Sequence, residues 1–207
     1  MKTIIKDIAE LEYSLFVVNT HAAGVQGDKG IYYTKYFPIT PYVLANMIKN
    51  GGSLGCYQQV YCSDRIRWIC LDFDCVKGTA VDLNGLSMEC VLPVTTYLDS
   101  IGIQYLQEYS GRRGIHVWIV FSSLITKLQG YEIITAIIDA VPKLKDSLKS
   151  EKWGLDRFPA NGLSKKNKVG KQVKFPLSCH TMGGRSFFFD AALLSELKSN
   201  LTNCKLV

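Results

Sequence analysis

The sequence has no apolar run near the length of about 20 residues that a membrane-spanning helix needs. Its first residues, MKTIIKDIAELEY, are charged and amphipathic, unlike a secretory signal peptide. It also contains no internal repeat and no long low-complexity segment, which excludes a solenoid or a linker-rich architecture. We therefore expect a folded cytoplasmic protein with no membrane partner.

The seven cysteines include no C-x-x-C pair, the spacing typical of zinc ribbons and redox motifs. They stand at positions 56, 62, 70, 75, 90, 179 and 204. Without a secretory context, disulfides are not expected either. We interpret the cysteines as free thiols packed as small hydrophobic side chains, and we expect no structural zinc.

Length and composition are those of an ordinary folded protein and not of a disordered one. The 207 residues are enough for one sizeable core or for two closely joined subdomains, 47% of them are hydrophobic, and 20% are charged. The net charge of +6 is a mild excess that suits a polyanionic partner without requiring one.

Patterning predicts helices and strands without a strict βαβ rhythm. Thr40, Pro41 and Gly51 frame a helix over 39–50, and Pro93 is expected to kink or divide a helix over 84–103. Further helices are expected over 131–150 and 191–200, and a glycine-rich loop over 21–30. Strands are expected over 13–20, 55–63, 66–74, 103–110, 115–121, 173–178 and 185–190. The fold class is therefore α/β or α+β with a largely antiparallel central sheet.

The stretch LDFD places Asp72 and Asp74 one residue apart in an apolar strand. Side chains at i and i+2 of a strand share a face, about 7 Å apart, so the two anions repel each other. A hard divalent cation between them would offset this repulsion. D-x-D also occurs in nucleases and glycosyltransferases, and a solvated or ion-paired strand end is the structural alternative.

A second motif, SGRRGIH, places Ser110, Arg112, Arg113 and His116 around a glycine-bounded turn that leads into an apolar strand. Such a turn allows close approach of backbone amides to phosphate oxygens, and paired guanidinium groups bind them bidentately. A hairpin turn with solvated arginines and a core histidine is the alternative.

D-x-D followed by S-G-R-R-G-x-H resembles the catalytic core of archaeo-eukaryotic primases and primase-polymerases. SGRRGIHVW is similar to the replicative small catalytic subunit, GLD at 154–156 to the family's third motif, and KFPLSCH at 174–180 to its nucleotide-binding stretch. The segments 55–74 and LDRFPAN resemble primase-polymerases of conflict systems and CRISPR-associated loci. The motifs occur in order over about residues 30–190.

This resemblance implies an N-terminal αβ part (about 1–66) joined to a part similar to an RNA-recognition motif (about 67–207), together forming one catalytic domain. Asp72, Asp74 and Asp156 would hold two Mg²⁺ or Mn²⁺ ions about 3.5–4 Å apart. A salt-bridged turn residue is the alternative role of Asp156. The expected nucleotide-binding residues are Ser110, Arg112, Arg113, His116, Lys174, Ser178 and His180.

The implied activity is template-directed nucleotidyl transfer with NTP or dNTP, on a single-stranded DNA template with a primer strand. Accessory or helicase domains are expected as fusions or partners. The lysines of the loop 161–172 are expected to contact the nucleic-acid backbone, although a solvated charge run has the same pattern: Lys165, Lys166, Lys168 and Lys171.

Two rival functions remain open from the sequence. One is another D-x-D enzyme, a metal-dependent nuclease or a transferase that uses a nucleotide-linked substrate. The other is a non-catalytic nucleic-acid-binding module, which would carry stacking aromatics on its central strand instead of acids.

Overall fold

The computed structural model describes residues 2–163 and 169–190, in which helices and antiparallel strands alternate. The helical elements are α1 (Lys2–Phe16), α2 (Pro41–Asn50), α3 (Leu83–Leu86), the π-helical turn η1 (Ser87–Val91), α4 (Leu92–Ser100), α5 (Lys127–Ala140) and α6 (Pro142–Leu148). The strands are β1 (Ala22–Gln26), β2 (Tyr32–Tyr36), β3 (Leu54–Tyr57), β4 (Arg65–Cys75), β5 (Leu106–Tyr109), β6 (Gly114–Thr126), β7 (Trp153–Phe158), β8 (Gln172–Lys174) and β9 (Phe187–Phe188).

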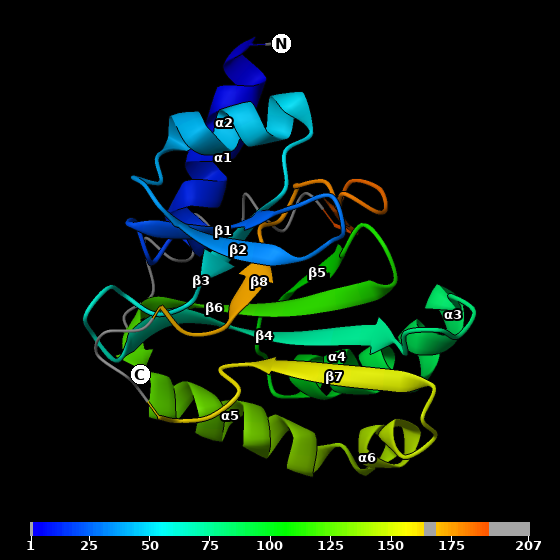
Figure 1. Cartoon of the computed structure of the whole chain (residues 1–207). Coiled ribbons are helices and arrows are strands. Elements are labelled where there is room, and N and C mark those ends of the chain that lie inside the picture. The colour runs from blue at the N-terminus through cyan, green and yellow to red at the C-terminus, as the bar shows by residue number, and fades with distance from the viewer. Residues whose placement is uncertain (1, 164–168, 191–207) are drawn as a thin grey trace.

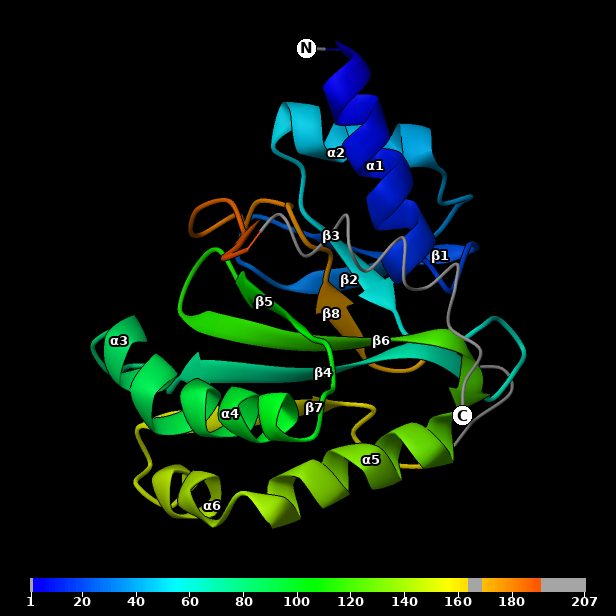
Figure 2. The ribbon, with the colours of Figure 1, turned by 180° about the vertical axis from the view of Figure 1, so that it is seen from behind.

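The strands form two sheets, in the orders β2-β1-β3-β8 and β7-β4-β6-β5-β9, and every pairing in them is antiparallel. Helices α1 and α2 lie above the smaller sheet, and α4, α5 and α6 lie below the larger one (Figures 1 and 2). This arrangement confirms the expected mixed α/β class with largely antiparallel sheets.

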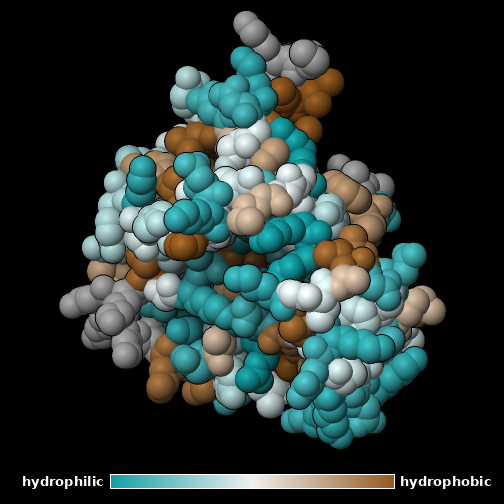
Figure 3. Space-filling model, turned by 45° about the vertical axis from the view of Figure 1, so that its right-hand side comes forward, coloured by the Kyte–Doolittle hydropathy of each residue, from teal (hydrophilic) through white to brown (hydrophobic). Residues whose placement is uncertain are grey.

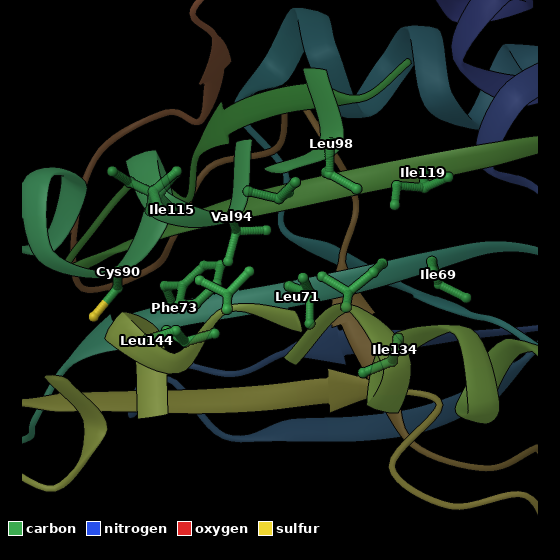
Figure 4. Close-up of a cluster of buried hydrophobic side chains, with 14 of the residues drawn as sticks. Ile69, Leu71, Phe73, Cys90, Val94, Leu98, Ile115, Ile119, Ile134 and Leu144 are labelled. Carbon is green, nitrogen blue, oxygen red and sulfur yellow. The ribbon is translucent and has the colours of Figure 1, made fainter. Parts of the chain in front are cut away.

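The larger sheet is buried on both faces, and the alternation of side chains along β4 explains how. Ile69, Leu71 and Phe73 pack into a core with the lower helices (Figure 4), whereas Trp68 and Cys70 pack into a second core that includes α1 and α2. Asp72 and Asp74 continue this second face, where the hydrophobic contacts end.

Several local predictions are confirmed. The Thr40 hydroxyl accepts a hydrogen bond from the Val43 amide at the start of α2, and Gly51 ends it in the left-handed conformation with φ 72°. The helical region before Ser100 is divided as expected, because the π-helical turn η1 precedes Pro93, which lies in the first turn of α4.

The prediction that cysteines are packed as small hydrophobic side chains is confirmed for four of the described residues. Six of the seven cysteines are free thiols, and four of these are buried: Cys56, Cys70, Cys75 and Cys90.

None of the described helices combines the length and apolar composition that crossing a membrane requires.

Two element predictions near the N-terminus are wrong. No strand covers 13–20, because residues up to Phe16 complete the amphipathic helix α1, which buries Ala9, Leu15 and Phe16. The expected loop 21–30 contains β1 instead. A Cβ at Gly24 would meet the end of the flexible Gln172 side chain, which would have to move aside.

The expected strand 55–63 is shorter and pairs differently. Only Leu54–Tyr57 is a strand, and it pairs with β1 and β8, while a single bridge between Gln59 and Ile66 joins this segment to β4. The smaller sheet thus takes strands from both sides of the expected boundary near residue 66, since β8 belongs to it. The expected helix 191–200 lies outside the described residues.

Candidate active site

A cleft of about 390 Å³ lies between the two sheets and collects residues from distant parts of the chain. Figure 3 shows this side of the molecule, where a hollow is surrounded mainly by hydrophilic residues. Ten of the residues expected to be functional line the cleft: Asp72, Asp74, Ser110, Arg112, Arg113, His116, Asp156, Lys171, Lys174 and His180.

Strand register brings the acids together. On the central strand β4, Asp72 pairs with His116 of β6 on one side and with Asp156 of β7 on the other. Directly paired residues of antiparallel strands have their side chains on the same face, so Asp156 joins Asp72 and Asp74 there. Asp156 therefore belongs to a strand and not to a turn.

Each of the three carboxylates faces a cationic partner. Arg113 Nη2 lies 2.8 Å from Asp74 Oδ2, Lys171 Nζ lies 2.8 Å from Asp156 Oδ1, and His116 Nε2 lies 3.4 Å from Asp72 Oδ1. Burial and the neighbouring Asp72 raise the pKa of Asp74 to about 6, although Arg113 and His116 oppose the shift. The repulsion expected from D-x-D is therefore offset by side chains of this chain.

Glu108 is a site residue that the motif analysis missed. It is fully buried, and its Oε2 accepts a 2.9 Å hydrogen bond from Trp118 Nε1 and lies 2.9 Å from His116 Nδ1. Burial alone would lower the pKa of His116, but Asp72 and Glu108 outweigh it and raise that pKa to about 10. The sequence does contain a signal for Glu108: it is an acidic residue within an expected strand, two residues before Ser110.

The turn SGRRG is held tightly in place. Ser110 Oγ accepts a 3.1 Å hydrogen bond from the Gly114 amide, and the Gly111 carbonyl accepts one of 2.6 Å from Gly184. Gly111 has φ 89°, and a Cβ there would overlap the Gly184 backbone. This packing fixes the turn that carries Arg112 and Arg113 at the cleft.

Lys174, the last residue of β8, and His180, from the segment that follows it, line the cleft. Lys174 Nζ donates to the Ser178 carbonyl at 3.1 Å, and Ser178 is itself fully buried, so it supports the lysine and does not line the cleft. Burial and the positive charges of Arg112, Lys174 and Arg113 lower the pKa of His180 to about 4.

The expected basic loop is described only in part. Lys165, Lys166 and Lys168 lie outside the described residues. Lys171 lines the cleft, where its ammonium contacts Asp156 and also lies 5.1 Å from the centroid of the Phe158 ring.

The three aspartates form an all-oxygen donor set, which suits a hard divalent cation such as Mg²⁺ or Mn²⁺. Within the described residues, however, no three acidic, histidine or cysteine side chains are placed so that they could hold a metal ion as they stand. Each of the three carboxylates is instead paired with its own cation. The donor chemistry fits, and binding would require at least Asp156 to release Lys171.

Comparison with protein families identifies the chain. Residues 12–203 match the family described as the archaeo-eukaryotic primase domain of the TOTE conflict system. The chain belongs to this family. No curated protein sequence is significantly similar to this primase domain.

A solved structure supports the same fold for this primase domain, and a second one is similar at a lower score. The polymerase domain of Mycobacterium tuberculosis ligase D in complex with DNA matches with a TM-score of 0.60 and 13% identity, over 98% of this chain and 88% of that one. The archaeo-eukaryotic primase domain of the cyanophage S-2L primase-polymerase gives a TM-score of 0.48 and 15% identity, over 92% and 96%. The family resemblance and the expected fold are thus confirmed.

Proposed function

We propose that this domain is a template-directed nucleotidyltransferase of the primase-polymerase type, which joins nucleoside triphosphates into a strand by divalent-metal catalysis. The observation that carries the proposal is the composition of the cleft: acids on two paired strands face a group of cations from three other segments. Family membership makes nucleotidyl transfer the chemistry to test first.

Asp72, Asp74 and Asp156 would hold Mg²⁺ or Mn²⁺, which when bound activates a hydroxyl nucleophile and neutralises phosphate charge. The chain's own part is to position and neutralise the triphosphate. Arg112, Arg113 and Lys174 supply positive charge around the cleft, and the glycine turn brings its backbone close to the ligand.

The two cleft histidines would play different parts. His116 stays protonated at neutral pH because its pKa is about 10, so its Nε2 donates a charge-assisted hydrogen bond. His180, with a pKa of about 4, is neutral at pH 7 and would contribute a hydrogen bond without charge. The positive charge around the triphosphate would therefore come from Arg112, Arg113 and Lys174, and His180 would bind the nucleotide as a neutral side chain.

The rival functions fit the cleft less well. A nuclease or a sugar transferase needs the acids but gives no reason for so many cations positioned to bind a triphosphate. A non-catalytic module gives no reason for three carboxylates on the face of a sheet, where each must be offset by a cation.

Extension of a labelled primer on a single-stranded template, with NTP or dNTP and Mg²⁺ or Mn²⁺, tests the proposal. Asp72→Asn combined with Asp74→Asn should lower incorporation about a thousandfold, since a metal site contributes several kcal/mol to the transition state. Asp64→Asn, an exposed turn acid, is the matched control. Metal-dependent shortening of the labelled strand by the wild type would instead identify a nuclease, and strand binding without either reaction a non-catalytic module.

A further inference from the structure

One face of β2 leads out of the cleft. Side chains alternate along a strand, so Tyr32, Thr34 and Tyr36 share a face. Tyr32 lines the cleft, and the Thr34 hydroxyl lies 2.6 Å from the hydroxyl of Tyr57 on β3, across the short strand β1. Figure 1 shows β2 at the outer edge of the smaller sheet.

At the far end of this face, Tyr36 borders a second groove of about 480 Å³. His21 and Tyr61 also line it, and their rings are stacked, with centroids 4.8 Å apart and planes 24° from parallel. Tyr36 is 70% exposed and Tyr61 51% exposed, so neither ring is buried in the core and both are accessible to a ligand. None of the described residues that line this groove is acidic.

This surface is aromatic, has no acidic lining residues and continues from the cleft proposed to bind a triphosphate. These properties suit single-stranded nucleic acid. Single-stranded nucleic acid is bound by rings on which bases stack, with little dependence on sequence, and it avoids acidic surfaces. The four steps from Tyr32 to Tyr36 advance about 13 Å along the strand. A stacked single strand covers that distance in about four nucleotides, at about 3.4 Å each.

We infer that β2 and the groove of His21, Tyr36 and Tyr61 bind the single-stranded part of a nucleic acid whose reacting end lies in the acidic cleft. Bases would stack on Tyr36 and on the exposed face of the Tyr61 ring, while Thr34 offers a hydroxyl between the groove and the cleft. The inference rests on the proposed function for the placement of the reacting end in the acidic cleft, but strand binding itself is measurable without catalysis.

The chain supplies a matched control. Tyr33 lies on the same strand and is 58% exposed, but it belongs to the opposite face. A general effect of removing an exposed tyrosine from β2 would appear in both Tyr33→Ala and Tyr36→Ala. An effect of lost base stacking would appear only in the second.

The experiment is fluorescence anisotropy of a labelled 12-nucleotide single strand, in buffer with a chelator so that no reaction occurs. Tyr36→Ala and Tyr61→Ala should each weaken binding about five- to a hundredfold, the effect of losing one base–ring stack. Tyr36→Phe should bind like the wild type, since the ring remains, and so should Tyr33→Ala. Thermal melting of each variant shows that the fold is retained.

Photocrosslinking with a strand that contains 5-bromouracil, followed by peptide mapping, gives an independent result, expected at Tyr36 or Tyr61. Equal binding by Tyr33→Ala and Tyr36→Ala would overturn the inference, even if the wild type extends primers. Selective loss with Tyr36→Ala in a protein that extends nothing would support the strand site and reject the proposed function. Crosslinks confined to the cleft would mean that the strand does not contact the groove of His21, Tyr36 and Tyr61, and this would also overturn the inference.

Discussion

Glu108 lies behind His116, with its Oε2 2.9 Å from the ring nitrogen Nδ1, and both side chains are buried. The contact fixes the ring so that Nε2 points to Asp72, 3.4 Å away, at the floor of the cleft. A buried acid of the core thus positions a histidine of the site through one hydrogen bond.

Glu108→Gln should reduce the pH dependence of stability that comes from His116, whose pKa is raised first by Asp72 and then by Glu108. A histidine whose pKa is raised from 6.5 to about 10 stabilises the fold fully below pH 6.5, and this contribution is lost as the pH rises toward 10. The variant should therefore lose about 1.5–3 kcal/mol at pH 6 and little at pH 10. Urea unfolding in metal-free buffer at both pH values measures this. An equal loss at both would mean that Glu108 acts only through its packing.

Arg112→Ala should weaken the binding of nucleoside triphosphate and leave strand binding unchanged. Arg112 lines the cleft beside Lys174 and His180, and loss of a charge-assisted phosphate contact costs about 1.5–3 kcal/mol, or ten- to a hundredfold in affinity. Titrations of labelled nucleotide and labelled strand, done separately, give the two affinities.

Arg67→Ala is the control for this variant, because Arg67 lies on β4 and donates to the Ser14 carbonyl away from the cleft. Weaker strand binding with unchanged nucleotide binding would assign Arg112 to the nucleic acid and contradict the prediction.

Much of this site could be predicted from sequence because its geometry is local. Alternation along one strand puts Asp72 and Asp74 on one face, and Gly111 marks a tight turn where only glycine fits. What could not be predicted depends on pairing across the fold. Glu108 meets His116 only because β5 and β6 form a hairpin in that register, and Lys171 meets Asp156 across two sheets.

The two wrong predictions near the N-terminus also arise because contacts between distant segments override local propensity. Gly24 and the neighbouring glycines indicate a loop when only local propensity is considered, whereas Ala22–Gln26 is a strand because it pairs with β2 and β3. Conversely, the β-branched and aromatic residues of 13–20 favour a strand locally, but burial of Leu15 and Phe16 against the sheet stabilises the end of a helix.

Lys171→Met should tighten the binding of Mn²⁺. The ammonium lies 2.8 Å from Asp156 and competes with any cation for that carboxylate. Since the lysine is about half exposed, we expect a modest gain of about three- to tenfold, screened by salt. Electron paramagnetic resonance of free Mn²⁺ during a titration measures the affinity. Lys77→Met, which also removes a cleft lysine, is the control for the change in net charge. Equal gains in both variants would contradict a specific role of the Lys171–Asp156 pair.

Glu12→Gln should stabilise the protein, increasingly so as the pH rises. Glu12 lies on α1 and is 3% exposed, and its two carboxyl oxygens have no hydrogen-bond partner among the described residues. Burial, together with the nearby Glu108, raises its pKa well above the usual value, although Lys174 opposes this. Folding must therefore keep a proton on Glu12 that the unfolded chain releases above about pH 4.5, which costs about 1.4 kcal/mol per pH unit.

A glutamine carries no proton to keep, so the melting temperature of Glu12→Gln should exceed that of the wild type by on the order of 5 °C at pH 7 and by much less at pH 5. Glu10→Gln is the control, because Glu10 lies on the same helix but is exposed, and among the described residues its ion-pair partner is Lys6, 3.7 Å away. Thermal melts of the three proteins at both pH values give the comparison. A gain for Glu12→Gln that does not grow with pH would show that the carboxyl group is charged in the folded state, with Lys174 as its counterion.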